Sequence, residues 1–120
     1  MSGVVPLLRA EGAAVALAVA LVAWQLGPAW WLVVLVLVAP DLAIAGYALG
    51  PKAGARIYNA AHLYVWPLAL GAIAWLAGRP VVGEVAALWA LHIGLDRALG
   101  YGLKLPSDFK DTHLGRIGKG

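Results

Sequence analysis

The sequence predicts an all-α, polytopic membrane protein with four transmembrane helices in a compact bundle and a short polar C-terminal tail. One basis is composition: 62% of the 120 residues are hydrophobic and only 12% are charged, with a mean hydropathy of +0.82. A soluble domain of this size could not cover so much apolar surface. The other basis is length, because four apolar stretches approach the roughly 20 residues that a helix needs to cross a bilayer.

We expect a single domain over residues 1–120, with helices at about 12–26, 29–49, 56–77 and 81–99. Glycine and proline mark the turns between them, at Gly27-Pro28, Gly50-Pro51-Lys52 and Gly78-Arg79-Pro80. Pro40 and Pro67 lie within the second and third helices, which they are expected to kink. Residues 100–120 are too hydrophilic to cross, and form the tail.

Basic residues predict the orientation of this bundle. With four crossings, one side receives eight of the nine Lys and Arg residues, and the other receives only Arg79. Basic residues accumulate on the cytoplasmic side, so we expect a multi-pass protein of the cell inner (plasma) membrane with both termini in the cytoplasm. The lipid bilayer is then its principal partner. A net charge of +3, scattered along the chain, does not suggest nucleic-acid binding.

Polar side chains from three helices are expected at similar depths. At 1.5 Å per residue, Asp41, His62, His92 and Asp96 lie about 6 to 13 Å from the inner ends of their helices. Placing an ionisable side chain inside a membrane costs free energy, so such residues usually have a structural or functional role. The chain has no cysteine, so any metal would take imidazole and carboxylate ligands, a combination that suits zinc, manganese or iron.

These four residues are the predicted ligands of a divalent metal. Asn59 and His113 are predicted to orient the substrate or a water molecule, with Glu11 near the same level. Arg97 is expected to reach the inner head groups or to clamp a phosphate. The tail is either a solvated, partly disordered end or is anchored on the bundle by Phe109 and Leu114, which would bring His113 beneath the cluster.

A structural interpretation of the same residues stays open. Intramembrane histidines commonly make hydrogen bonds between helices, and Asp41 could pair with Arg97 across the bundle. Three functions follow from these choices: a metal-dependent membrane hydrolase acting on lipid-like esters or phosphoesters, a small proton-coupled transporter, or a membrane scaffold without catalysis. Each is compatible with a homo-oligomer, because four helices expose a large lateral surface.

The polar motifs resemble those of the domain-of-unknown-function 4260 family of small bacterial integral membrane proteins, over about Leu8 to Gly115. The similar stretches are Ala39-Pro40-Asp41-Leu42 with Gly46-Tyr47, Ile57-Tyr58-Asn59 with His62, His92-Ile93-Gly94 with Asp96-Arg97, Gly100 through Lys104, and Phe109 through Gly115. The resemblance implies a compact four-helix membrane protein and brings no activity with it. The Asp and His pattern also looks like the ligand sets of larger intramembrane zinc hydrolases, an analogy at the level of ligand type only.

Overall fold

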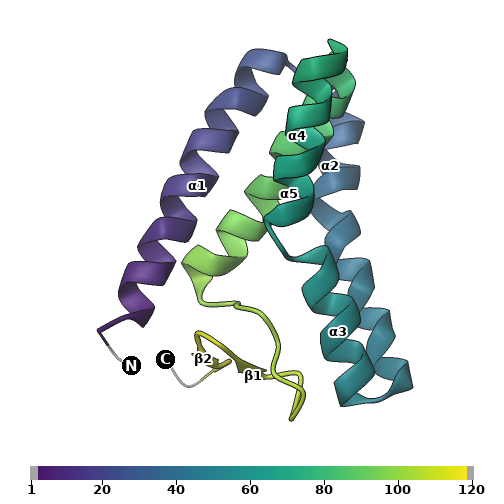
Figure 1. Cartoon of the computed structure of the whole chain (residues 1–120). Helices are drawn as coiled ribbons and strands as arrows, with labels where there is room; N and C mark the ends of the chain where they lie inside the picture. The colour runs from purple at the N-terminus through teal and green to yellow at the C-terminus, as the bar shows by residue number, and fades with distance from the viewer. Residues whose placement is uncertain (1–2, 119–120) are drawn as a thin grey trace.

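The computed structural model describes residues 3–118 and is mainly helical up to Leu99 (Figure 1). Its helices are α1 (Val5–Leu26), α2 (Trp30–Val38), the 3₁₀ helix η1 (Ala39–Leu49), α3 (Pro51–Ala61), α4 (Val65–Ala77) and α5 (Pro80–Leu99). Two short antiparallel strands, β1 (Asp111–Thr112) and β2 (Gly115–Arg116), form a hairpin in the tail. The all-α prediction is confirmed.

The second predicted helix changes its winding at Pro40. Residues 30–38 are α-helical, and residues 39–49 continue as a 3₁₀ helix in which proline occupies the second position. Proline has no backbone N–H and therefore cannot continue the hydrogen-bond ladder. The continuous apolar rod from Trp30 to Leu49 is still long enough to cross a membrane.

The third predicted helix, expected to be only kinked over 56–77, is divided in two. α3 ends at Ala61, His62 leaves the helical conformation with φ −114° and ψ 22°, and α4 starts at Val65. In one continuous helix Pro67 would lose its hydrogen bond and clash with the preceding turn. The break places Pro67 in the first turn of α4 instead, where a missing N–H costs little.

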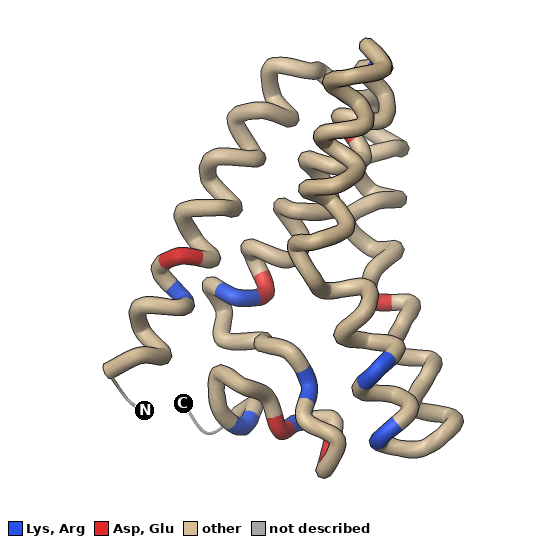
Figure 2. Tube along the Cα trace, in the orientation of Figure 1, with Lys and Arg blue, Asp and Glu red and all other residues tan. Residues whose placement is uncertain are grey.

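Three segments of the described chain are long and apolar enough to cross a membrane: Val5–Leu26, Trp30–Leu49 and Pro51–Ala77. α5 has 20 residues, but it carries Glu84, Asp96 and Arg97. The polytopic membrane character is therefore supported by three helices, and the fourth crossing remains a prediction. Most charged residues gather toward the end of the molecule that holds both termini, which we call the basic end (Figure 2).

α5 is the central helix, and packs against α1, α2 and α4. Leu88 and Ile93 on this helix are fully buried. Its closest approach is to α1, where a Cβ on Gly94 would lie 2.9 Å from the backbone nitrogen of Ala16 and a Cβ on Gly12 would overlap the side chain of Arg97. Small residues of this kind let membrane helices approach closely, so α1 packs tightly on α5 beside Arg97.

The tail is folded onto the basic end of the bundle, between α1 and α3 (Figure 1). Phe109 packs edge-on against Tyr47, with ring centroids 5.2 Å apart, and Leu114 is buried. Lys104 is also buried, with its ammonium 3.8 Å from the centre of the Phe109 ring. Of the two expectations for the tail, anchoring by Phe109 and Leu114 is the one observed.

Candidate metal centre

The structure brings Asp41, His62, His92 and Asp96 into one group, although they come from η1, the end of α3 and α5. One potential ligand atom from each residue lies within 4.8 Å of all the others. The two imidazole Nε2 atoms are 3.2 Å apart. From His62 Nε2 the carboxylate oxygens of Asp41 and Asp96 lie 3.4 and 3.5 Å away, and from His92 Nε2 they lie 3.2 and 3.3 Å away.

Backbone carbonyls fix both imidazole rings. His62 Nδ1 lies 2.8 Å from the Tyr58 carbonyl oxygen, and His92 Nδ1 lies 2.6 Å from that of Leu37. A carbonyl oxygen can only accept, so each Nδ1 carries the proton that it donates. In a neutral imidazole this leaves each Nε2 as a bare lone pair, the form in which histidine binds metals.

The Leu37 carbonyl is available because of the neighbouring proline. In the 3₁₀ pattern the N–H of residue 40 would bond to the carbonyl of residue 37, and Pro40 has no N–H. His92 fills this vacant position from α5. The same local sequence that changes the helix winding thus orients a candidate ligand.

The interruption of the helix at His62 leaves carbonyls at the end of α3 without helical hydrogen bonds. Side chains of α5 donate hydrogen bonds to two of them. Trp89 Nε1 donates to the Ala61 carbonyl at 2.8 Å, and Arg97 donates to the His62 carbonyl at 3.0 Å. The predicted alternative, in which Arg97 pairs with Asp41, is therefore not the arrangement observed. These contacts hold the end of α3 against α5 and fix His62 beside His92.

Five of the six distances among the four ligand atoms lie close to those of tetrahedral coordination, and the sixth, between the two carboxylates, is at most 4.8 Å. Zinc–nitrogen and zinc–oxygen bonds of 2.0 to 2.2 Å imply ligand-to-ligand distances of about 3.3 to 3.6 Å in a tetrahedron. The five distances given above span 3.2 to 3.5 Å. Two carboxylates would also balance the charge of a divalent cation, which favours its binding among apolar helices.

Exposure differs strongly within the group. The two histidine side chains are 3% and 8% exposed and that of Asp96 is 18% exposed, whereas that of Asp41 is 49% exposed. Three candidate ligands are thus held inside the bundle. The fourth, Asp41 on the 3₁₀ helix, contacts both imidazoles through its carboxylate and is half-exposed.

Asn59 lies outside this group and joins α3 to the tail. Its side-chain oxygen accepts from the Lys104 N–H at 2.6 Å, and its amide nitrogen donates to the Lys104 carbonyl at 2.9 Å. Burial lowers the pKa of the Lys104 amine. The predicted role of Asn59 in orienting a substrate stays a prediction. In the structure its two hydrogen bonds clamp the tail to α3.

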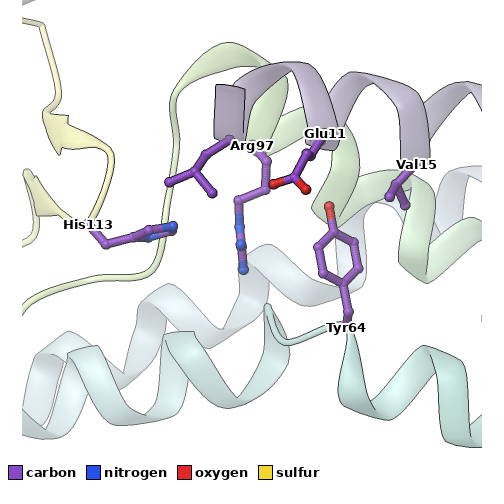
Figure 3. Close-up of a pocket in the computed structure, with 7 residues that line it drawn as sticks. Glu11, Val15, Tyr64, Arg97 and His113 are labelled. Atoms are coloured by element: carbon purple, nitrogen blue, oxygen red, sulfur yellow. The ribbon is translucent and has the colours of Figure 1, made fainter. Parts of the chain in front are cut away.

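His113 and Glu11 lie at a second place, a cavity of about 220 Å³ lined also by Tyr64 and Arg97 (Figure 3). His113 Nδ1 accepts from the Leu103 N–H at 2.9 Å. Burial, and then the positive charge of Arg97, lowers the pKa of the His113 imidazole. The tail therefore brings His113 to this cavity rather than into the group of four.

Sequence reasoning selected the four candidate ligands but missed the groups that orient them. These are the carbonyls of Leu37 and Tyr58 and the side chain of Trp89. Pro40 and Pro67 were the available signals, because prolines leave carbonyls free in the preceding turn. Which side chain reaches each carbonyl depends on packing that no local pattern displays.

Comparisons with known proteins agree with the extent of the resemblance. No curated protein and no solved structure matches the chain. One family model, described as Domain of unknown function (DUF4260), matches residues 6–117. This range includes the four candidate metal ligands and all residues that line the cavity of about 220 Å³. The chain belongs to the DUF4260 family.

Proposed function

We propose that this protein is a membrane metalloprotein that binds one divalent ion through Asp41, His62, His92 and Asp96, and uses it to hydrolyse lipid-like esters or phosphoesters. The observation that supports metal binding is the convergence of four acceptor atoms. With both Nδ1 atoms donating to carbonyls, the Nε2 lone pairs of the neutral imidazoles lie 3.2 Å apart and 3.2 to 3.5 Å from the carboxylate oxygens of Asp41 and Asp96. A cation between them removes this repulsion.

Zinc is the ion that suits this set best. Zinc accepts tetrahedral sites with nitrogen and oxygen ligands, whereas manganese prefers octahedral oxygen-rich sites. Iron(II) in non-haem sites uses two histidines and one carboxylate with several open positions. The observed distances leave room for four close ligands, which favours zinc over both.

The exposure of Asp41 is what favours catalysis over a purely structural ion. A catalytic zinc site has about three protein ligands and one open position, where the ion lowers the pKa of a bound water to about 7. The buried His62 and His92 and the largely covered Asp96 would provide the three protein ligands. Displacement of the half-exposed Asp41 carboxylate would open the fourth position and leave that carboxylate nearby as a proton acceptor.

The proposed location of this chemistry is the cytoplasmic leaflet of the inner membrane. The group of four belongs to the half of the molecule nearer the basic end, where α3 ends and α5 approaches the tail (Figure 1). Basic residues favour the cytoplasmic side. Lipid head groups there would be the accessible esters and phosphoesters.

The first test is metal content. Protein without a polyhistidine tag, purified in mild detergent and offered zinc, is expected to hold about one ion per chain by mass spectrometry. His92→Gln and Asp96→Asn should lose it while remaining folded by circular dichroism. His113→Gln is the matched control, because it removes a histidine that lies outside the group. A chain that binds no zinc under these conditions rules out the proposal.

The second test separates catalysis from metal binding. Zinc-loaded protein should release product from short-chain phospholipids or fatty-acid esters, and Asp41→Asn should lower the rate by about tenfold or more while retaining part of the zinc. Replacement of zinc by cobalt should give the intense visible absorption of a tetrahedral site. Zinc binding without hydrolysis of any ester offered would leave the ion without a catalytic role.

A proton-coupled metal transporter is the second candidate, favoured by the presence of four protein ligands. A complete set leaves no open position for a substrate, and metal binding to histidines and carboxylates displaces protons. Zinc-dependent proton movement across liposomes, lost in His92→Gln, would support transport in place of hydrolysis. A scaffold would show neither metal binding nor flux.

A further inference from the structure

Arg97 lines the cavity of about 220 Å³ at the basic end. Within residues 3–118, no Asp or Glu lies within ion-pair distance of its guanidinium. One of its N–H groups donates to the His62 carbonyl, and the guanidinium carbon lies 5.2 Å from the centre of the Tyr64 ring. Partly buried charges are costly unless they are paired, so an anion in this cavity would be stabilised.

Two further donors line the same cavity. The Tyr64 hydroxyl is buried and has no hydrogen-bond partner in the described part of the chain. His113 accepts the Leu103 N–H at Nδ1, so the neutral ring carries its proton on Nε2. Figure 3 shows the His113 ring, from the tail, directed toward Arg97, and the Tyr64 hydroxyl, from the start of α4, directed toward the Glu11 carboxylate in the same cavity.

The remaining groups define the kind of anion. Glu11 is exposed at the edge of the cavity, and would repel a free dianion but accept hydrogen bonds from an ammonium group. Leu8 and Val15 form an apolar wall on α1. A guanidinium recognises phosphate in a bidentate manner, so the cavity suits a phosphodiester attached to a primary amine and next to an acyl chain.

We infer that this cavity binds the head group of an amine-bearing phospholipid, with Arg97, Tyr64 and His113 donating to the phosphate and Glu11 accepting from the ammonium. The cavity begins one residue along α5 from the candidate ligand Asp96, and Arg97 contacts the carbonyl of the candidate ligand His62. As a substrate site it rests on the proposed function. As a lipid site it requires no metal.

Binding of a short-chain phosphatidylethanolamine is therefore measured by calorimetry on chelator-treated protein in a maltoside detergent. Arg97→Gln should weaken binding by about tenfold or more, because a charge-assisted hydrogen bond is lost. The matched control is Arg56→Gln, which removes an exposed arginine outside the cavity and should leave binding unchanged. Equal losses in both variants would show a general charge effect and overturn the inference.

Tyr64→Phe keeps the test decisive if Arg97→Gln does not fold. It removes only the unpaired hydroxyl, and should weaken binding by about two- to tenfold. Phosphatidylcholine, whose methylated amine cannot donate, should bind less tightly than phosphatidylethanolamine, and Glu11→Gln should remove this preference. Unchanged binding in both Tyr64→Phe and Glu11→Gln would overturn the assignment.

Two soluble probes distinguish a lipid from a free phosphoester. Glycerophosphoethanolamine has the same head group without acyl chains, and inorganic phosphate lacks the amine as well. Both should compete at least about tenfold more weakly than the lipid, because the apolar wall contributes nothing to them. Equal competition by either probe would overturn the lipid assignment. Since metal is absent throughout, failure here is separate from failure of the metal site.

Discussion

The carboxamide of Asn59 is the residue-scale link between the bundle and its tail. It exchanges two hydrogen bonds with the backbone of Lys104, and Lys104 is itself buried. Asn59→Ala would leave a buried N–H and a buried carbonyl without partners, so we expect a loss of about 1 to 3 kcal/mol in unfolding free energy. Faster amide hydrogen exchange at residues 103–114 is the measurement.

The zinc content of Asn59→Ala decides between a clamp and a site residue. As a clamp, Asn59 affects the tail and leaves the four candidate ligands able to bind about one ion per chain. Asn59→Asp is the matched variant: it keeps the shape but places a carboxylate oxygen against the Lys104 carbonyl, and should release the tail too. Loss of zinc with an unchanged tail would contradict the clamp.

His113 makes the docking of the tail sensitive to acid. Its imidazole pKa in the folded chain is lowered from the usual value of 6.5 by burial and by Arg97, so protonation is disfavoured when the tail is docked. The resulting stability is fully present above pH 6.5 and is lost as the pH falls through the lower folded value. The proton would also remove the acceptor used by the Leu103 N–H.

We therefore expect protease cleavage within residues 103–114 to accelerate between pH 7.5 and pH 5, with a protease active at both values. His113→Gln retains an acceptor that does not titrate, so its cleavage rate should change little over this range. The same acceleration in that variant would assign the pH dependence to another group.

At the residue scale, the candidate ligands could be predicted because helical rise converts sequence position into depth. This depth calculation predicts the four candidate ligands, and the structure brings them together: Asp41, His62, His92 and Asp96. Glu11 and His113 were expected near the same cluster, but they line a separate cavity. Depth alone does not tell on which side of α5 a side chain lies. Arg97 lies between the group of four and the cavity, because it contacts the His62 carbonyl and also lines the cavity.

At the element scale, the packing of α1 on α5 depends on glycine. A Cβ on Gly94 would lie 2.9 Å from both the Ala16 nitrogen and the Gly12 carbonyl oxygen, which are backbone atoms that cannot rotate away. Gly94→Ala should therefore separate the helices and lower the unfolding free energy by about 1 to 3 kcal/mol. Thermal unfolding in detergent, followed by circular dichroism, measures this loss.

Gly71→Ala is the matched control for this prediction. Its Cβ would meet the Ala86 methyl group at 3.8 Å, an ordinary contact between α4 and α5. Alanine is also the better helix former, so this variant should be as stable as the parent or slightly more stable. Equal destabilisation by both substitutions would show that the α1–α5 contact is not specially close.

The ends of helices were predictable where glycine marks a turn, but two starts were not: α1 begins at Val5 and not near residue 12, and α3 begins at Pro51 and not near residue 56. The ends at Leu26, Leu49 and Leu99 follow the predicted boundaries. The division of the third helix lies upstream of Pro67 because the structure moves this proline into a first turn. The break point also depends on Trp89 and Arg97, which satisfy the released carbonyls from another helix.

At the scale of the whole molecule, the number of crossings depends on α5. Its 20 residues span about 30 Å, the thickness of a bilayer core. Asp96 faces the group of four and α1, α2 and α4 surround the helix, so its polar residues need not meet lipid. We therefore expect α5 to cross, which places the tail on the same side as the N-terminus and opposite the turn at Gly27.

Because the chain contains no cysteine, single cysteines can report this topology. Gln25→Cys and Ser107→Cys replace exposed residues near the first turn and in the tail. With four crossings and cytoplasmic termini, a membrane-impermeant maleimide added to intact cells should label Gln25→Cys and not Ser107→Cys, and lysed cells should label both. With three crossings the tail would emerge on the side of Gln25, and both variants would be labelled in intact cells. That result would remove the fourth crossing and separate Arg97 and His113 from Leu8 and Glu11 of α1, so the candidate lipid cavity could not form.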